Sequence, residues 1–196
     1  MPRLFLSLSI ALLFALPGPS HAGHPVGRIR TSMGEILVYL YSQTPHHQAS
    51  FIKLARAHYW DSLTFNRVVK NFVAQGGCPD TPAGFKGSPY NLAPEFNPAL
   101  RHVYGAFAAG RDDNPEMLSA GCQFYIVINK AGEPRLDDKY TVYGQVIKGM
   151  DVATAMALAP QDSANMPLVP IRLHVDVIEM SDKELEAYGI KPGDSR

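Results

Sequence analysis

Short apolar and β-branched runs follow one another along most of this chain, separated by glycines, prolines and polar residues. Two runs lie on either side of the turn Ser32-Met33-Gly34 in residues 26–41, which predicts a β-hairpin. Further runs predict strands at residues 64–69, 72–75, 103–108, 123–128, 141–147 and 171–177. Strands spaced this closely favour a closed or strongly curled antiparallel sheet, and the 16 glycines and 16 prolines supply ordered turns between them.

Two further segments carry a helical pattern. Thr44-Pro45 has the form of a helix N-cap followed by proline at the first helical position. A helix of about three turns would place four residues on one apolar face: Phe51, Leu54, Ala55 and His58. A second helix is expected at residues 150–158, before Pro160. We assign residues 23–180 to one domain and residues 181–196 to a peripheral C-terminal tail.

The first 22 residues have the three regions of a secretory signal peptide. Arg3 is a lone positive charge, residues 4–16 are nearly all apolar, and Ser20-His21-Ala22 is a small-x-small cleavage site. The apolar run of about 13 residues is short for a bilayer span, so we expect cleavage and a protein that is not in the membrane. An uncleaved anchor is the alternative.

Charge and motif content exclude several classes of function. The 18 basic and 18 acidic residues balance, so no basic excess indicates a nucleic-acid partner. The seven histidines do not have the spacing of a zinc site, and the glycine-rich segments lack the lysine-serine ending of a phosphate-binding loop. We therefore expect no metal and no cofactor.

The most informative stretch is Phe65 to Gly77. It predicts two strands around the turn Lys70-Asn71, with Arg67 and Gln75 flanked by aromatic and aliphatic residues, and then a tight Gly76-Gly77 turn that needs unusual φ angles. Such a pattern suits a shallow apolar pocket with a few fixed hydrogen-bond donors. The simpler alternative is a pair of core strands with a surface arginine.

The same stretch resembles the signature of the cyclophilin-type peptidyl-prolyl cis-trans isomerases. Residues 119–126 and 136–146 resemble two further blocks of that family, in its order and near its spacings. The resemblance implies a mainly β fold, a closed eight-stranded antiparallel barrel capped by two helices. In that family the barrel interior is packed and the peptide binds on the outer surface.

The resemblance also implies roles for individual residues. Arg67 matches the catalytic arginine, and Phe124 is expected to point into the core. Gly110 and Arg111 match positions that offer backbone groups to the peptide, and Tyr140 stands where eukaryotic members commonly have histidine. The full set expected to bind substrate is Phe72, Val73, Gln75, Gly110, Arg111, Gln123, Tyr125, Leu136 and Tyr140.

Four positions depart from the family pattern. Asn66 stands where many members have histidine, Val73 where methionine is usual, Tyr125 where phenylalanine is usual, and Arg135 where the best-known members have a tryptophan that packs against cyclosporin. The matched pocket positions hold no histidine, which is compatible with isomerisation because that reaction transfers no proton.

The sequence leaves the state of Cys78 and Cys122 open. An oxidising compartment would allow them to pair, but the sequence does not show whether they meet the distance that a disulfide requires. We expect free thiols, because members of the resembled family fold without a bridge at these positions.

The resemblance thus predicts a monomeric peptidyl-prolyl cis-trans isomerase that acts on X-Pro bonds of proline-containing peptides and partly folded secreted proteins. The short loops near the site are similar to those of bacterial members, which implies the periplasm. One alternative is a proline-peptide binding chaperone (holdase) with little turnover. Another is a secreted β-barrel that binds a small ligand inside.

Overall fold

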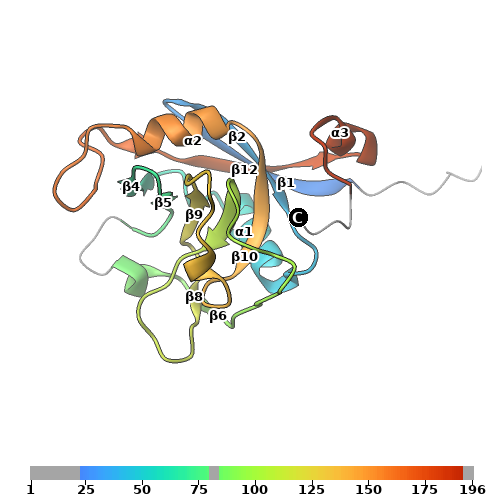
Figure 1. Cartoon of the computed structure of the whole chain (residues 1–196), viewed down its shortest axis with the longest axis horizontal. Coiled ribbons are helices and arrows are strands. Elements are labelled where there is room, and N and C mark those ends of the chain that lie inside the picture. The colour runs from blue at the N-terminus through green and yellow to red at the C-terminus, as the bar shows by residue number, and fades with distance from the viewer. Residues whose placement is uncertain (1–22, 80–83, 192–196) are drawn as a thin grey trace, which may run out of the picture.

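Eight strands pair into one antiparallel sheet, in the order β12-β1-β2-β10-β7-β9-β5-β4 (Figure 1). The structure is a computed structural model that describes residues 23–79 and 84–191, so the predicted signal peptide lies outside the described residues. The strands of this sheet are β1 (His24–Thr31), β2 (Gly34–Leu40), β4 (Arg67–Val69), β5 (Val73–Gly76), β7 (Ala106–Ala109), β9 (Phe124–Val127), β10 (Val142–Lys148) and β12 (His174–Met180). The predicted mainly β fold with a large antiparallel sheet is confirmed.

Two short strand pairs supplement this sheet. β3 (Thr64–Phe65) pairs with β11 (Ile171–Arg172), and β6 (Asn91–Leu92) pairs with β8 (Ser119–Ala120). One residue separates β3 from β4, and one separates β11 from β12. β3 and β11 continue the two end strands of the sheet, β4 and β12, and are hydrogen-bonded to each other. Among the described strands, β4 and β12 are not paired with each other.

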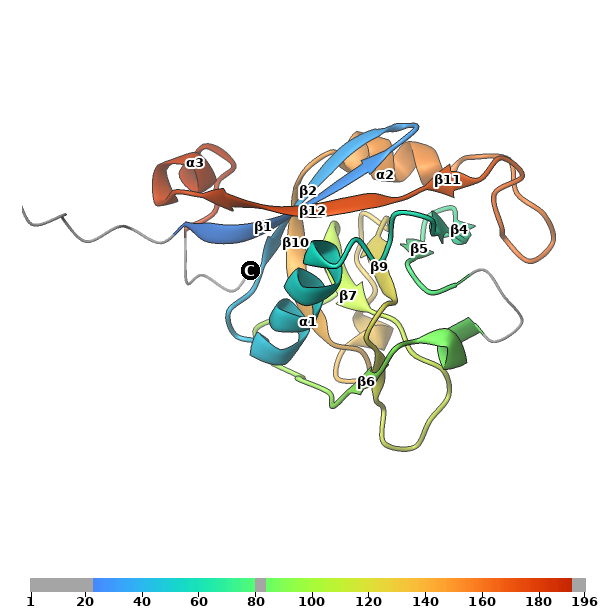
Figure 2. The same ribbon diagram turned by 180° about the vertical axis from the view of Figure 1, so that it is seen from behind.

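Two helices lie against the sheet, as predicted (Figures 1 and 2). In α1 (Pro45–Arg56) the predicted residues Phe51, Leu54 and Ala55 are buried. In α2 (Met150–Ala157) Ala153, Met156 and Ala157 are buried, and the apolar faces of both helices belong to one core cluster. The prediction for His58 was wrong: α1 ends at Arg56, and His58 follows it as an exposed residue with a positive φ of 54°.

The start of α1 is capped differently from the sequence prediction. Thr44 occupies the N-cap position, but its side chain makes no capping hydrogen bond and instead donates to the carbonyl of Tyr41. The carboxylate of Glu95 accepts hydrogen bonds from the backbone N–H groups of His46 and His47 at 3.1 and 2.9 Å. A distant acidic residue therefore satisfies the free N–H groups of the first turn.

Alternate residues along the strands belong to two different apolar clusters. Phe124 and Ile126 of β9 belong to the cluster that contains both helix faces, so the prediction that Phe124 points into the core is confirmed. Tyr125 and Val127 belong to the second cluster, on the opposite face of the sheet. The site described below therefore lies outside the interior core.

The disulfide Cys78–Cys122 contradicts the prediction of free thiols. β5 and β9 are antiparallel, with Gly76 opposite Phe124, so continuing the same register places Cys78 opposite Cys122. Their Cα atoms are 5.2 Å apart, within the range that a disulfide spans. Gly77 lies between the end of β5 and Cys78 and turns the chain with a φ of 103°, as predicted from the Gly76-Gly77 pair.

Part of the segment set aside as a peripheral tail packs on the domain. Ser181 and Glu184 form a capping box at the start of α3 (Asp182–Ala187). Leu185 and Ile190 are buried in the same apolar cluster as Met180 and Val26. α3 lies at the end of β1 and β12 that is far from α2 (Figures 1 and 2). This segment therefore follows the predicted domain in sequence, but two of its apolar side chains are buried in the second apolar cluster.

Candidate functional site

A row of directly opposed residues crosses three neighbouring strands on the outer face of the sheet. Arg67 of β4 lies opposite Gln75 of β5, and Gln75 lies opposite Tyr125 of β9. Side chains of directly opposed residues point to the same face of a sheet. The antiparallel register thus brings together three residues that the sequence separates by up to 58 positions.

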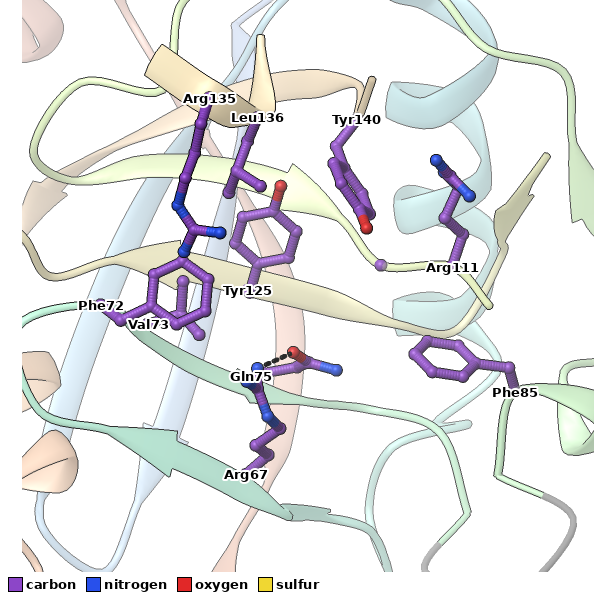
Figure 3. A pocket seen from close by; sticks show the side chains of 11 residues that line it. Arg67, Phe72, Val73, Gln75, Phe85, Arg111, Tyr125, Arg135, Leu136 and Tyr140 are labelled. Atoms are coloured by element: carbon purple, nitrogen blue, oxygen red, sulfur yellow. Dashed lines mark hydrogen bonds between the residues drawn. The ribbon is translucent and has the colours of Figure 1, made fainter. Parts of the chain in front are cut away.

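These side chains open onto a cleft of about 370 Å³ (Figure 3). All but one of the predicted site residues line it, together with Phe85 and Arg135. Phe85 comes from a short 3-10 helix (Gly84–Gly87), and its role was not predicted because no pattern in the sequence connects that helix with the other site segments. The lining residues are Arg67, Phe72, Val73, Gln75, Phe85, Gly110, Arg111, Tyr125, Arg135, Leu136 and Tyr140.

Arg67 is held at the edge of the cleft. Its Nη1 donates a hydrogen bond of 3.0 Å to Oε1 of Gln75, and its guanidinium lies 5.5 Å from the centre of the Phe72 ring. Burial lowers the pKa of Arg67, the charge of Arg135 lowers it further, and Tyr140 opposes the shift. An arginine starts so far above neutral that the side chain remains a cation under working conditions.

Tyr125 forms part of the floor and is tied to a buried histidine. Its hydroxyl lies 2.9 Å from Nε2 of His102, whose Nδ1 lies 2.7 Å from Oδ1 of Asp137. Burial lowers the pKa of His102, and this outweighs the opposing effect of Asp137. The imidazole is therefore neutral near pH 7, and the geometry fits a ring that donates from Nδ1 to Asp137 and accepts at Nε2 from the Tyr125 hydroxyl.

His102 was missed from the sequence. It lies behind Tyr125 and is not among the described residues that line the cleft. The signal that could have found it is the departure at position 125, because a buried tyrosine hydroxyl needs a hydrogen-bond partner.

Gln123 does not line the cleft, contrary to the prediction. The residue is buried, and its Oε1 accepts a hydrogen bond of 2.8 Å from the backbone N–H of Cys78. It precedes β9 and lies next to the disulfide in sequence. Its side chain therefore fixes the turn after β5 and is not part of the cleft lining.

The loop after β7 contributes through a side chain. The N–H of Gly110 donates to the carbonyl of Gln123, and the carbonyl of Gly110 accepts from the N–H of Ala120. The resemblance predicted that Gly110 offers backbone groups to a peptide, but its N–H and its carbonyl both form hydrogen bonds within the protein. Arg111 extends its guanidinium over the Tyr140 ring, 4.7 Å from the ring centre.

Arg135 occupies the opposite part of the cleft. Its guanidinium lies 4.6 Å from the centre of the Phe72 ring, and its Nε donates to Glu133 at 2.9 Å. Leu136, the next residue, completes the apolar wall (Figure 3). The departure from tryptophan thus places a third arginine in the lining of the cleft.

In residues 23–79 and 84–191, no group of three or more histidine, cysteine, aspartate or glutamate side chains could hold a metal ion. Within those ranges no helix combines the length and the apolar composition needed to cross a bilayer.

Comparison with known proteins assigns the family. A model of the cyclophilin type peptidyl-prolyl cis-trans isomerase/CLD family matches residues 26–177. A peptidyl-prolyl cis-trans isomerase of Schizosaccharomyces pombe is 33% identical over 149 residues, covering 74% of this chain and 93% of that protein. One from Acinetobacter baylyi is 31% identical over 153 residues, covering 74% of this chain and 80% of that protein.

Solved structures share the fold. A cyclophilin type isomerase of Cryptosporidium parvum, solved in the presence of the dipeptide Ala-Pro, has a TM-score of 0.68 at 24% identity and covers 80% of this chain and 99% of that one. The chain described here belongs to the cyclophilin-type peptidyl-prolyl cis-trans isomerases, and it is an enzyme of that activity.

Proposed function

We propose that Arg67 is the catalytic residue and that the cleft holds the proline of an X-Pro segment. The observation that carries this proposal is a single arrangement: a guanidinium fixed by Gln75 at the edge of an apolar floor. The presence of Ala-Pro with the Cryptosporidium parvum relative supports a proline peptide as the ligand.

The chemistry is rotation about a tertiary amide. Its barrier is roughly 18–20 kcal/mol, because resonance between the nitrogen lone pair and the carbonyl is lost in the twisted state. A site that binds the twisted amide better than either planar isomer accelerates the rotation. Arg67 does this by donating a hydrogen bond to the proline nitrogen, whose lone pair becomes available only when resonance is broken.

The rest of the cleft holds the substrate still while the amide turns. Phe72, Val73, Leu136 and the ring of Tyr125 enclose the proline, and exclusion of water strengthens the hydrogen bond from Arg67. Gln75 keeps the guanidinium aimed at the floor before substrate arrives. No proton is transferred, so neither an acid nor a base is needed.

A rigid scaffold is required for this arrangement, and we infer that the sheet closes into a barrel. The pairing of β3 with β11 supports closure, because these segments continue the two end strands. The hydrogen bond of 2.9 Å from the N–H of Val68 to the carbonyl of Asn165 supports it further. Closure stabilises β4, the strand that carries Arg67.

We propose that the enzyme is exported and assists the folding of other exported proteins, in the periplasm if the host is a bacterium. The signal-like sequence of residues 1–22 and the disulfide both support this, since structural disulfides persist in oxidising compartments. Uncatalysed X-Pro isomerisation takes tens to hundreds of seconds, slow enough to limit folding.

Two measurements test these proposals. NMR exchange spectroscopy on a short Ala-Pro peptide measures turnover directly, and a wild-type enzyme that binds the peptide without accelerating exchange would be a holdase. Intact mass and N-terminal sequencing of the protein from its native host test export. An N-terminus at Gly23 in the extracytoplasmic fraction supports export, whereas the full-length chain in the cytoplasm contradicts it.

A further inference from the structure

Among the described residues, the charged side chains that line the cleft are all of one sign. They belong to Arg67, Arg111 and Arg135, and no aspartate or glutamate of residues 23–79 or 84–191 is among the lining residues. The chain as a whole is balanced, with 18 basic and 18 acidic residues, so this charge is local. A cleft with one sign of charge and apolar walls concentrates the field and attracts ligands of the opposite sign.

Two of these guanidiniums have neutral partners. Arg67 donates to the amide oxygen of Gln75, and Arg111 donates to the backbone carbonyls of Asp112 and Lys139. Within the part of the chain that the structure describes, neither lies within ion-pair distance of a carboxylate. Arg135 is paired with Glu133, yet 64% of its side chain remains exposed.

Three other acidic residues near the cleft interact with residues outside its lining. Asp112 accepts a hydrogen bond from the side chain of Asn114, and Asp138 pairs with Arg101 at 3.0 Å. Asp137 accepts from the ring of His102, behind the floor. The positive charge of the cleft is therefore only partly offset. Burial of Arg67, together with the nearby charge of Arg135, lowers the pKa of Arg67.

Aromatic rings support the two outer arginines. Arg111 lies over Tyr140 and Arg135 lies over Phe72, with ring-centre distances of 4.7 and 4.6 Å. The two arginines come from opposite sides of the floor formed by Tyr125 and its neighbours (Figure 3). Stacking on a ring fixes the guanidinium plane and leaves N–H donors at its edge for a carboxylate.

We propose that this isomerase prefers X-Pro segments that carry an acidic side chain directly before or directly after the X-Pro pair, and that Arg111 and Arg135 are the residues that select it. The preference rests on the proposed placement of proline in this cleft. Planar guanidinium donors match the two oxygens of aspartate or glutamate, and charge-assisted hydrogen bonds of this kind are stronger than neutral ones. The selected substrates are acidic, proline-containing segments of unfolded proteins.

Matched peptides test the preference. In an Ala-Pro frame, glutamate, glutamine or lysine is placed directly before or directly after the Ala-Pro pair, and kcat/KM is measured by NMR exchange or a protease-coupled assay. At low ionic strength we expect glutamate peptides to exceed glutamine peptides about five- to tenfold at one or both positions, with lysine peptides lowest. At about 1 M salt, where the screening length is about 3 Å, the ratio is expected to shrink toward one.

Variants assign the effect to the cleft. Arg111→Gln and Arg135→Gln are each expected to lower the glutamate-to-glutamine ratio of kcat/KM, and the double variant should bring this ratio to about one. Arg56→Gln, exposed on α1, is the matched charge control and should keep it. Equal rates for glutamate and glutamine peptides in the wild type, or a ratio that survives in the double variant, would overturn the proposal. If the wild-type enzyme does not turn over the neutral peptide at all, that result would instead contradict the proposed function.

Discussion

Arg67 and Gln75 lie directly opposite each other on β4 and β5, and Nη1 of the arginine donates to the amide oxygen of the glutamine at 3.0 Å. The bond fixes the direction of the guanidinium without neutralising its charge. A cation held by a neutral partner needs little reorganisation when the amide nitrogen becomes an acceptor, which is the condition for electrostatic stabilisation of a transition state.

Arg67→Lys is expected to lower kcat/KM at least tenfold and Arg67→Ala at least a hundredfold, because lysine lacks the reach and the planar donors of arginine. Peptide affinity, measured by NMR titration, should fall far less than turnover, since the interaction is made mainly in the twisted state. Wild-type activity should stay nearly flat from about pH 6 to 8, where the guanidinium remains charged. A folded Arg67→Ala enzyme with near-full turnover would refute the catalytic assignment, and equal losses of affinity and turnover would favour a holdase.

Alanine variants of Gln123 and Gln75 should have different defects, one in stability and the other in turnover. Gln123→Ala removes the acceptor of the buried Cys78 N–H, so it is expected to lower the free energy of unfolding by about 1–3 kcal/mol. Gln75→Ala, which frees Arg67, should lower kcat with a smaller effect on stability. Urea unfolding and steady-state kinetics on both variants check this. The distinction fails if Gln123→Ala is as stable as the wild type but loses peptide affinity.

The disulfide should stabilise the protein. Replacing both Cys78 and Cys122 by alanine is expected to lower the free energy of unfolding by about 2–4 kcal/mol, because the bridge restricts the unfolded chain. Chemical denaturation with and without a reductant measures it, and the double variant should no longer respond to the reductant. Mass spectrometry of the protein from its native host should find the peptides of the two cysteines joined, and free thiols at both positions would contradict the bridge.

Acid should destabilise the fold through two buried histidines. Burial lowers the pKa of His47 and of His102, in each case against the opposing effect of a carboxylate. Because the folded pKa lies below the unfolded value of about 6.5, the unfolded state binds protons first, and stability is lost as pH falls below that value. A further loss of stability is expected as the pH falls below about 4.5. Burial raises the pKa of Glu95, but hydrogen bonds from His47 and from the backbone N–H of His46 outweigh it and lower this pKa.

Urea unfolding between pH 7 and 5 measures the histidine contribution. His102→Gln should reduce the slope of stability against pH. Tyr125→Phe, which restores the common family residue, is expected to keep turnover but to lose stability, because Nε2 of His102 is left without its partner. A steeper slope in His102→Gln would contradict the direction of the pKa shift.

Cyclosporin binding should be weak. Arg135 cannot supply the apolar face and indole N–H of the tryptophan found in the best-known members, and desolvating its charge is costly. Arg135→Trp is expected to raise cyclosporin affinity at least tenfold while Ala-Pro turnover is retained, as measured by isothermal titration calorimetry and NMR exchange. Nanomolar inhibition of the wild type would show that position 135 does not contact the ligand.

The sequence determined the strands of the large sheet and the two helices that lie against it, because alternating side chains and local turn chemistry act over a few residues. Phe124 inside and Tyr125 outside follow from the two-residue period of a strand alone. The family signature then selected Arg67 and most of its neighbours, since those positions lie within three short blocks.

Only the tertiary structure decided which distant groups meet. The bridge between Cys78 and Cys122 depends on the register of β5 against β9, and the placement of His102 behind Tyr125 depends on how β9 packs against the loop before β7. Gln123 looked like a binding residue from its place in a family block, yet its oxygen is bound to the N–H of Cys78. Such contacts are set by strand pairing between segments far apart in the chain, and no local pattern carries that information.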